Sequence, residues 1–178
     1  MFFLESERLK LIPLTYYQLL LIDNNRAALE RSLNLNPSVM LVDDYNKGEL
    51  KAALQNHWLP NTQIYPDLYQ WYTSWEVVLK NINTSIGSIS FGGYPDDYGE
   101  TTIGYLMDQQ HWGQGYATEA VLTLKHWGFK FSILKTLKAD TQLSNYASQR
   151  VLLKAGFVPT HKDNTHQHFK IRNTSASY

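Results

Sequence analysis

The sequence predicts a mixed α/β fold, of the α+β kind, with one central sheet of six to seven strands and about four flanking helices. Three observations predict it. Short stretches that alternate polar and apolar residues recur along the chain. Two of them, 75–80 and 85–91, are joined by turn residues and predict an antiparallel hairpin. A long helical pattern over 116–132 separates strands at 101–107 and 136–141, which predicts a parallel pair.

The elements before the hairpin follow from the same patterns. Residues 8–14 alternate and predict a first strand, which Pro13 ends. Thr15 is placed to cap a helix that runs to about Leu33, and 46–59 predicts a second helix with Pro60 beyond its end. Residues 60–75 are crowded with aromatic side chains. Two interpretations of them stay open: packing beneath the sheet, or one wall of a substrate groove.

The elements after the parallel pair are shorter. Asn145 is an expected N-cap for a helix that ends at Gly156, a C′ glycine. Closing strands are expected at 157–159 and 167–171, and residues 173–178 are expected to be a flexible tail.

Composition narrows the class of protein. The 178 residues predict a single domain over 1–178. Sixteen basic and sixteen acidic residues cancel, so no global field points to a nucleic acid or a membrane as partner. The chain has no cysteine, no signal-peptide pattern and no apolar run of membrane-spanning length. We therefore expect a cytoplasmic protein.

A glycine-rich turn joins the strand at 101–107 to the long helix. Glycine at 113 and 115 gives the turn backbone freedom and removes the Cβ atoms that would block a ligand, while the helix behind offers unpaired N–H groups. Such a helix start suits a phosphate group. A P-loop is excluded because no lysine follows Gly115, and a dinucleotide motif is disfavoured because Thr118 stands at its third glycine. A tight turn without a ligand stays an alternative.

Two motifs carry a family resemblance. The segment Gln110-x-x-Gly113-x-Gly115 resembles the Gln/Arg-x-x-Gly-x-Gly/Ala signature of the GNAT superfamily of N-acetyltransferases. The run over 112–120 is similar to the branch of ribosomal-protein N-terminal acetyltransferases, the RimJ/RimL-like enzymes. Residues 145–157 are similar to the later Asn-x-x-Ser and Lys-x-Gly-Phe motif of the same family. The resemblance covers about residues 5–172.

The resemblance implies a fold and an activity. The implied GNAT fold has a mostly antiparallel, twisted sheet that holds coenzyme A between two splayed parallel strands. The implied activity is transfer of an acetyl group from acetyl-CoA to a primary amine, with a protein or peptide N-terminal α-amine as the favoured acceptor. A polyamine, amino sugar or antibiotic is the alternative acceptor, and an acyl-CoA-binding module without turnover is the alternative function. No metal is expected, and the chain is expected to be a monomer or a homodimer.

The resemblance also implies which residues bind the donor. They belong to the end of the strand, the glycine turn and the start of the short helix: Leu106, Met107, Asp108, Gln110, Gly113, Gln114, Gly115, Tyr116, Ala117, Thr118, Asn145 and Ser148. For Asn145 an ordinary helix cap is the alternative.

The catalytic groups depart from the common family pattern. Many relatives have a glutamate where this chain has Thr102, so Glu100, on the same strand face, is the candidate base. A solvated turn carboxylate is its alternative, and Glu76 and His111 are weaker candidates. Many relatives protonate the leaving thiolate with a tyrosine where this chain has Leu152. The resemblance instead implies Ser148 as the proton donor, with direct transfer in a ternary complex.

The acceptor amine sets how strong a base is needed. An α-amine with a pKa near 7.7–8.0 costs about 1 kcal/mol to deprotonate at neutral pH, whereas a lysine amine near 10.4 costs roughly 4.6 kcal/mol. A site with a modest base therefore suits an N-terminus far better than a lysine.

Overall fold

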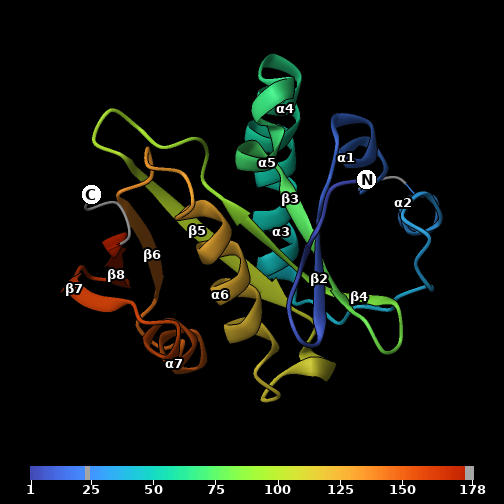
Figure 1. Cartoon of the computed structure of the whole chain (residues 1–178). Coiled ribbons are helices and arrows are strands. Elements are labelled where there is room, and N and C mark those ends of the chain that lie inside the picture. The colour runs from blue at the N-terminus through green and yellow to red at the C-terminus, as the bar shows by residue number, and fades with distance from the viewer. Residues whose placement is uncertain (23–24, 175–178) are drawn as a thin grey trace.

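The computed structural model describes residues 1–22 and 25–174. In this part of the chain, eight strands form one sheet in the order β1-β2-β3-β4-β5-β6-β8-β7, and helices cover both faces (Figure 1). The strands are β1 Leu4–Glu5, β2 Leu9–Pro13, β3 Ser74–Leu79, β4 Thr84–Phe91, β5 Glu100–Met107, β6 Thr136–Gln142, β7 Val158–Lys162 and β8 His166–Arg172. The α-helices are α1 Tyr16–Ile22, α2 Arg26–Ser32, α3 Asp44–Ala53, α4 Leu59–Ile64, α5 Tyr69–Tyr72, α6 Tyr116–Gly128 and α7 Tyr146–Lys154.

The sheet is antiparallel except for its β5–β6 pair, which confirms the predicted hairpin and the predicted parallel pair. β5 pairs with β6 along Glu100 to Thr102 and then with β4 along Ile103 to Met107. Beyond Thr102 no β5–β6 pairing is present in the described part of the chain, so the two strands separate toward their C-terminal ends. This splay opens the edge of the sheet at which β5 leads into α6.

Alternation along the strands gives each face its own core. On one face, α6 and α7 bury apolar side chains against Leu11, Val77 and Phe91. On the other, α1 and α2 pack with Ile12 and Val78. Trp71 and Trp75 are buried on the α6 face beside Trp127, whereas Tyr65 is exposed. Much of the aromatic crowding at 60–75 is therefore packing beneath the sheet.

The helix expected from Thr15 to Leu33 is two helices. Asn25 caps α2, with its Oδ1 accepting from the N–H of Ala28, and α1 ends at Ile22. The expectation that the helix continues through residues 23–24 lies outside the described residues. β1 is a short strand that the pattern did not predict, and it raises the strand count above the expected six to seven.

Pro60 does not end the second helix. A π-helical segment, Leu54–Trp58, follows α3, and α4 then continues through Pro60. The N–H of Leu59 bonds the carbonyl of Leu54, five residues earlier. The wider π turn changes which carbonyls need a donor, so the missing N–H of a proline is tolerated there.

The long helix and the chain end also differ in detail from expectation. α6 ends at Gly128 rather than near Ser132, because the chain then turns, with the Phe131 N–H bonded to the Gly128 carbonyl. Asn173 is buried and its Nδ2 donates to the carbonyls of Phe129 and Leu134, so the start of the expected tail is held in place. Residues 175–178 of that tail lie outside the described residues.

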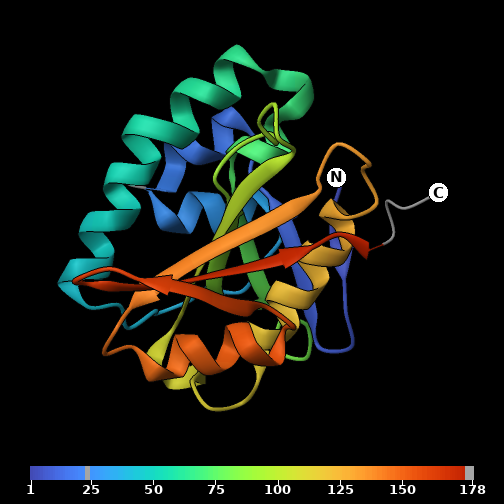
Figure 2. The same ribbon diagram turned by 90° about the vertical axis from the view of Figure 1, so that its left-hand side faces the viewer.

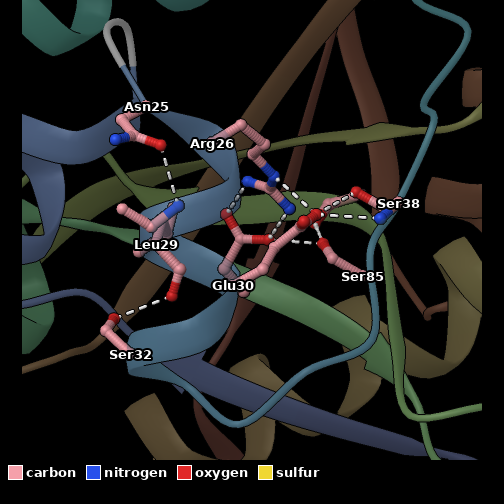
Figure 3. A network of polar contacts seen from close by, with 10 residues as sticks. Asn25, Arg26, Leu29, Glu30, Ser32, Ser38 and Ser85 are labelled. Carbon is pink, nitrogen blue, oxygen red and sulfur yellow. Dashed lines mark hydrogen bonds and ion pairs between the residues drawn. The ribbon is translucent and has the colours of Figure 1, made fainter.

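A buried ionic network attaches α2 to the sheet (Figure 3). Both oxygens of Glu76 accept from the guanidinium of Arg26, each at 2.7 Å, and Glu76 also accepts from Ser85. Glu30 accepts from Arg26 at 3.1 Å and from the N–H and hydroxyl of Ser38. Burial acts to lower the pKa of Arg26, but the two carboxylates outweigh it and raise that pKa above its ordinary value. The network thus ties the segment around Ser38 to the sheet.

No helix within the described residues is long and apolar enough to cross a membrane.

Candidate functional site

A cleft of about 930 Å³ lies where β5 and β6 separate. One wall is the end of β5 with the glycine turn and the start of α6, and the facing wall is the start of α7. Figure 2 shows the orange ribbon of α7 beside the yellow turn that precedes α6. The segment 41–46, which leads into α3, forms a third side. Of the residues expected to bind the donor, the following line the cleft: Leu106, Met107, Gly113, Gly115, Tyr116, Ala117, Thr118, Asn145 and Ser148.

The glycine turn has the backbone that its sequence predicts. Gly113 and Gly115 both have positive φ, +75° and +84°, and Gly115 is the N-cap of α6 without a side-chain cap. The backbone N–H groups from Gly113 to Thr118 have no hydrogen-bond acceptor among the described residues. A Cβ added at Gly113 would have no atom within 4 Å, so space lies beside this turn. Free N–H groups, a helix start and open space fit a diphosphate.

Asp108 fixes the turn from inside. Its Oδ1 accepts from the N–H groups of Leu41 and Gln110, at 3.1 and 3.2 Å, and its Oδ2 is 3.1 Å from Nδ1 of His111. Burial acts to raise the pKa of this carboxyl, but these partners outweigh it and hold the pKa below its ordinary value. Two backbone groups beside this carboxylate also have hydrogen-bond partners already. The Asp108 N–H donates to Ile86, and the Met107 carbonyl accepts from Trp112 Nε1 at 2.8 Å.

Three expected donor-binding residues do not line the cleft. One is the buried Asp108, and the other two are Gln110 and Gln114. Gln110 donates through Nε2 to the carbonyl of Val39 at 3.0 Å. The carbonyl of Gln114 accepts from Arg8 at 3.0 Å. Both residues stabilise the turn in the structure, and their contact with a donor stays a prediction.

An ion pair from the N-terminal strand region supports the turn. Glu119, in the first turn of α6, accepts from the Ser6 hydroxyl at 2.7 Å and from the backbone and guanidinium of Arg8 at 2.7–2.8 Å. Arg8 also lies over the ring of Tyr116, 4.5 Å from its centroid. The position of Gly115 and Tyr116 therefore depends on contacts with residues more than a hundred positions earlier in the chain.

The Glu119→Gln variant is expected to raise the KM for acetyl-CoA three- to tenfold and to cost about 1 kcal/mol of unfolding free energy. Burial acts to raise the pKa of Glu119, but hydrogen bonds from Arg8 and Ser6 outweigh it and hold the pKa below its ordinary value. The stabilisation is therefore present above pH 4.5 and is lost as the pH falls through the folded-state pKa. The free energy of unfolding, measured with urea, should therefore fall more steeply between pH 7 and pH 3 for the wild type than for the variant.

Glu49→Gln is the matched control, because Glu49 is exposed on α3 and has no partner in the described contacts. It should leave the KM and the pH dependence unchanged. Equal pH dependence of the wild type and Glu119→Gln would contradict the proposed support of the turn.

The wall formed by α7 carries the predicted side chains. Asn145 caps the helix, with Oδ1 accepting from the Ser148 N–H at 3.0 Å, and it also faces the cleft. The N-cap is thus observed, and contact of the same side chain with a ligand stays a prediction. The Ser148 hydroxyl is 2.8 Å from the hydroxyl of Tyr105.

Tyr105 was not singled out from the sequence. It lies on β5 and faces the cleft, and its hydroxyl oxygen is also 3.2 Å from the Ser148 carbonyl oxygen. Burial raises the pKa of Tyr105 to about 12, against a smaller opposing effect of the hydrogen bond with Ser148. Tyr105 lies two residues before the end of β5, beside the predicted splay. This position could have identified it from the sequence.

The structure does not bring Glu100 to this group. Glu100 begins β5, is ion-paired with Lys138, and does not line the cleft. The five residues of strand from Glu100 to Tyr105 span about 17 Å at about 3.3 Å per residue. Glu76 is buried in the Arg26 network, and His111 lines the cleft beside Asp108. Leu152, at the position of the relatives' tyrosine, is buried in the core.

No cluster of three or more histidine, cysteine or acidic side chains in the described part of the chain could hold a metal ion. The site consists of free main-chain donors and a tyrosine on the wall formed by β5 and α6, with an asparagine and a serine on the facing wall.

Comparisons with known proteins match one family and one fold. The family model described as "Acetyltransferase (GNAT) domain" matches residues 11–158. An uncharacterized N-acetyltransferase of Bacillus subtilis strain 168, YjdG, is 31% identical over 98 residues, 55% of this chain and 58% of the relative. The chain spans about half the length of the curated relatives it matches.

Solved structures show the same fold. The ribosomal-protein-S5-alanine acetyltransferase from Vibrio fischeri aligns with a TM-score of 0.68 at 20% identity and 100% coverage of both chains. RimL, a ribosomal L7/L12 α-N-protein acetyltransferase in complex with coenzyme A, aligns with a TM-score of 0.66 at 14% identity, covering 96% of this chain and 98% of RimL.

Proposed function

The chain belongs to the acetyltransferase (GNAT) family, and from that membership we propose that it transfers an acetyl group from acetyl-CoA to a primary amine. The favoured acceptor is the α-amine of a protein or peptide. The observation that carries the proposal is the cleft at the β5–β6 splay. It has unpaired N–H groups from Gly113 to Thr118 on one wall and Asn145 and Ser148 on the other.

The donor would lie along the cleft with its diphosphate on the glycine turn. Each charge-assisted hydrogen bond from a free N–H is worth roughly 1.5–3 kcal/mol, so several bind the donor without a lysine. The pantetheine arm would then extend along Leu106 toward Asn145, with the sulfur near Ser148. When bound, acetyl-CoA supplies the activated thioester, and the protein supplies orientation and a proton.

Ser148 is the proposed proton donor to the departing sulfur. As the amine nitrogen bonds to the acetyl carbon, the carbon–sulfur bond breaks and the sulfur takes a proton from the Ser148 hydroxyl. The amine gives up its proton to solvent, from which Ser148 is reprotonated. The chain has no cysteine to carry an acetyl group, which favours direct transfer within a ternary complex.

An α-amine is the favoured acceptor because the hydrogen bonds of Ser148 among the described residues are with Tyr105 and Asn145, and none is with a carboxylate or an imidazole. A site without a strong base can serve an amine that is partly neutral at pH 7 but not a lysine amine. Two structural neighbours, the ribosomal-protein-S5-alanine acetyltransferase and RimL, are named for ribosomal-protein acceptors, which supports the same choice.

Thiol release at pH 7 tests the proposal with three kinds of acceptor: a peptide with a free N-terminus, the same peptide N-acetylated but carrying lysine, and small amines such as spermidine or glucosamine. The difference of about 3.6 kcal/mol in deprotonation predicts a preference of at least about a hundredfold for the α-amine over lysine. Preference for a small amine would support the alternative acceptor. Coenzyme A binding without turnover on any amine would support the binding module, which the absence of a base beside Ser148 permits.

A further inference from the structure

Tyr105 and Ser148 form a hydroxyl pair across the cleft. Tyr105 comes from β5 and Ser148 from the first turn of α7, and their oxygens are 2.8 Å apart. The next-nearest acceptor for the tyrosine is the Ser148 carbonyl, at 3.2 Å. Both side chains line the cleft. The pair therefore spans the gap into which the proposed thioester would extend.

The direction of this hydrogen bond decides what Ser148 can do. Each hydroxyl carries one proton. If Ser148 donates to Tyr105, its proton faces the tyrosine and is turned away from a ligand. If Tyr105 donates to Ser148 Oγ, the serine proton is free to point into the cleft. The 2.8 Å separation fits either direction of donation. A departing thiolate beside Ser148 would accept the serine proton and so select the second arrangement.

The surroundings keep Tyr105 a donor. Its buried phenol stays protonated at neutral pH, since its pKa is raised to about 12. The Ser148 backbone N–H is already taken by Asn145 Oδ1, so the first turn of α7, which carries the serine, is fixed by its own cap.

From this geometry we propose that Tyr105 is a positioning residue for the acetyl transfer: it donates to Ser148 Oγ and so directs the Ser148 proton toward the leaving sulfur. The inference rests on the proposed function. In many relatives a tyrosine on this helix protonates the leaving thiolate, but here Leu152 stands at that position, is buried and does not line the cleft. Tyr105 and Ser148 together would take over that role. Tyr105 keeps its own proton throughout, so the sulfur receives a single proton from Ser148.

A double-mutant cycle on kcat tests the proposal. Tyr105→Phe keeps the ring and removes the hydroxyl, and it should lower kcat about tenfold with the KM for acetyl-CoA within twofold of wild type. Ser148→Ala should lower kcat about a hundredfold. In the Ser148→Ala protein, Tyr105→Phe should change kcat by less than twofold, because the hydroxyl that Tyr105 positions is absent. Tyr146→Phe is the matched control on the same helix; that ring is 67% exposed and the change should leave kcat unaltered.

Each result decides the matter. A tenfold loss from Tyr105→Phe in both backgrounds would mean that the tyrosine only packs β5 against α7, and the proposal would be wrong. Unchanged kcat in Tyr105→Phe alone would also overturn it while leaving the acetyltransferase intact. A wild type that releases no thiol with any amine would instead remove the proposed function, and this role with it.

Discussion

Gly113→Ala is expected to weaken coenzyme A binding by at least about a hundredfold while the protein stays folded. The added methyl meets no protein atom within 4 Å, so any clash must be with the ligand. The left-handed backbone at φ +75° is also strained for alanine, by about 1–2 kcal/mol, and relief of that strain turns the adjoining N–H groups away. Loss of two charge-assisted hydrogen bonds, at about 1.5–3 kcal/mol each, accounts for the predicted factor. Calorimetric titration measures it.

Gly156→Ala separates strain from binding. Gly156 follows α7 with φ +90°, and an added Cβ would lie 3.3 Å from Ile171 Cδ1, away from the cleft. It should cost stability comparable to Gly113→Ala and leave the dissociation constant for coenzyme A unchanged. Equal affinities for wild type and Gly113→Ala would show that the turn does not bind the diphosphate.

Arg26→Met is expected to lower the free energy of unfolding by about 3–5 kcal/mol. The variant removes the cation but leaves Glu76 and Glu30 buried, with side chains only 4% and 5% exposed. Both carboxylates would then lack the partner that offsets their desolvation. Urea unfolding at pH 7 is the direct measurement.

Arg31→Met is the matched control, since Arg31 lies on the exposed side of the same helix without a partner in the described contacts. Its cost should stay within about 0.5 kcal/mol. A similar small cost for Arg26→Met would mean that the network shown in Figure 3 contributes little to stability.

The strands, the parallel pair and the glycine turn could be predicted because each depends on neighbouring residues. Gly113 and Gly115 needed positive φ, and Asn145 needed only the N–H three residues ahead to cap α7. The break between α1 and α2 was missed because Asn25 fits the helical pattern until its capping role is seen. The helical segment continues through Pro60 because a π turn precedes it, and no sequence pattern marks a π turn.

The site divides in the same way. Residues at the glycine turn were predictable from their spacing, whereas Tyr105 and Arg8 contribute through contacts across 43 and 111 positions. Glu100 was proposed as a base from strand alternation alone, which gives the face of a residue but not its distance from the splay. The pairing of β5 with β6 around Glu100 places it at the closed end instead. Long-range register of this kind is set by the whole sheet.

The central claim is that the open turn at Gly113 to Thr118 binds the diphosphate of coenzyme A. Calorimetric titration of the wild type with coenzyme A and, in parallel, with pantetheine, which lacks the diphosphate, tests it most directly. We predict binding of coenzyme A and at least a hundredfold weaker binding of pantetheine, from the loss of two or more charge-assisted hydrogen bonds. No heat with coenzyme A, or equal affinity for the two ligands, would contradict the claim.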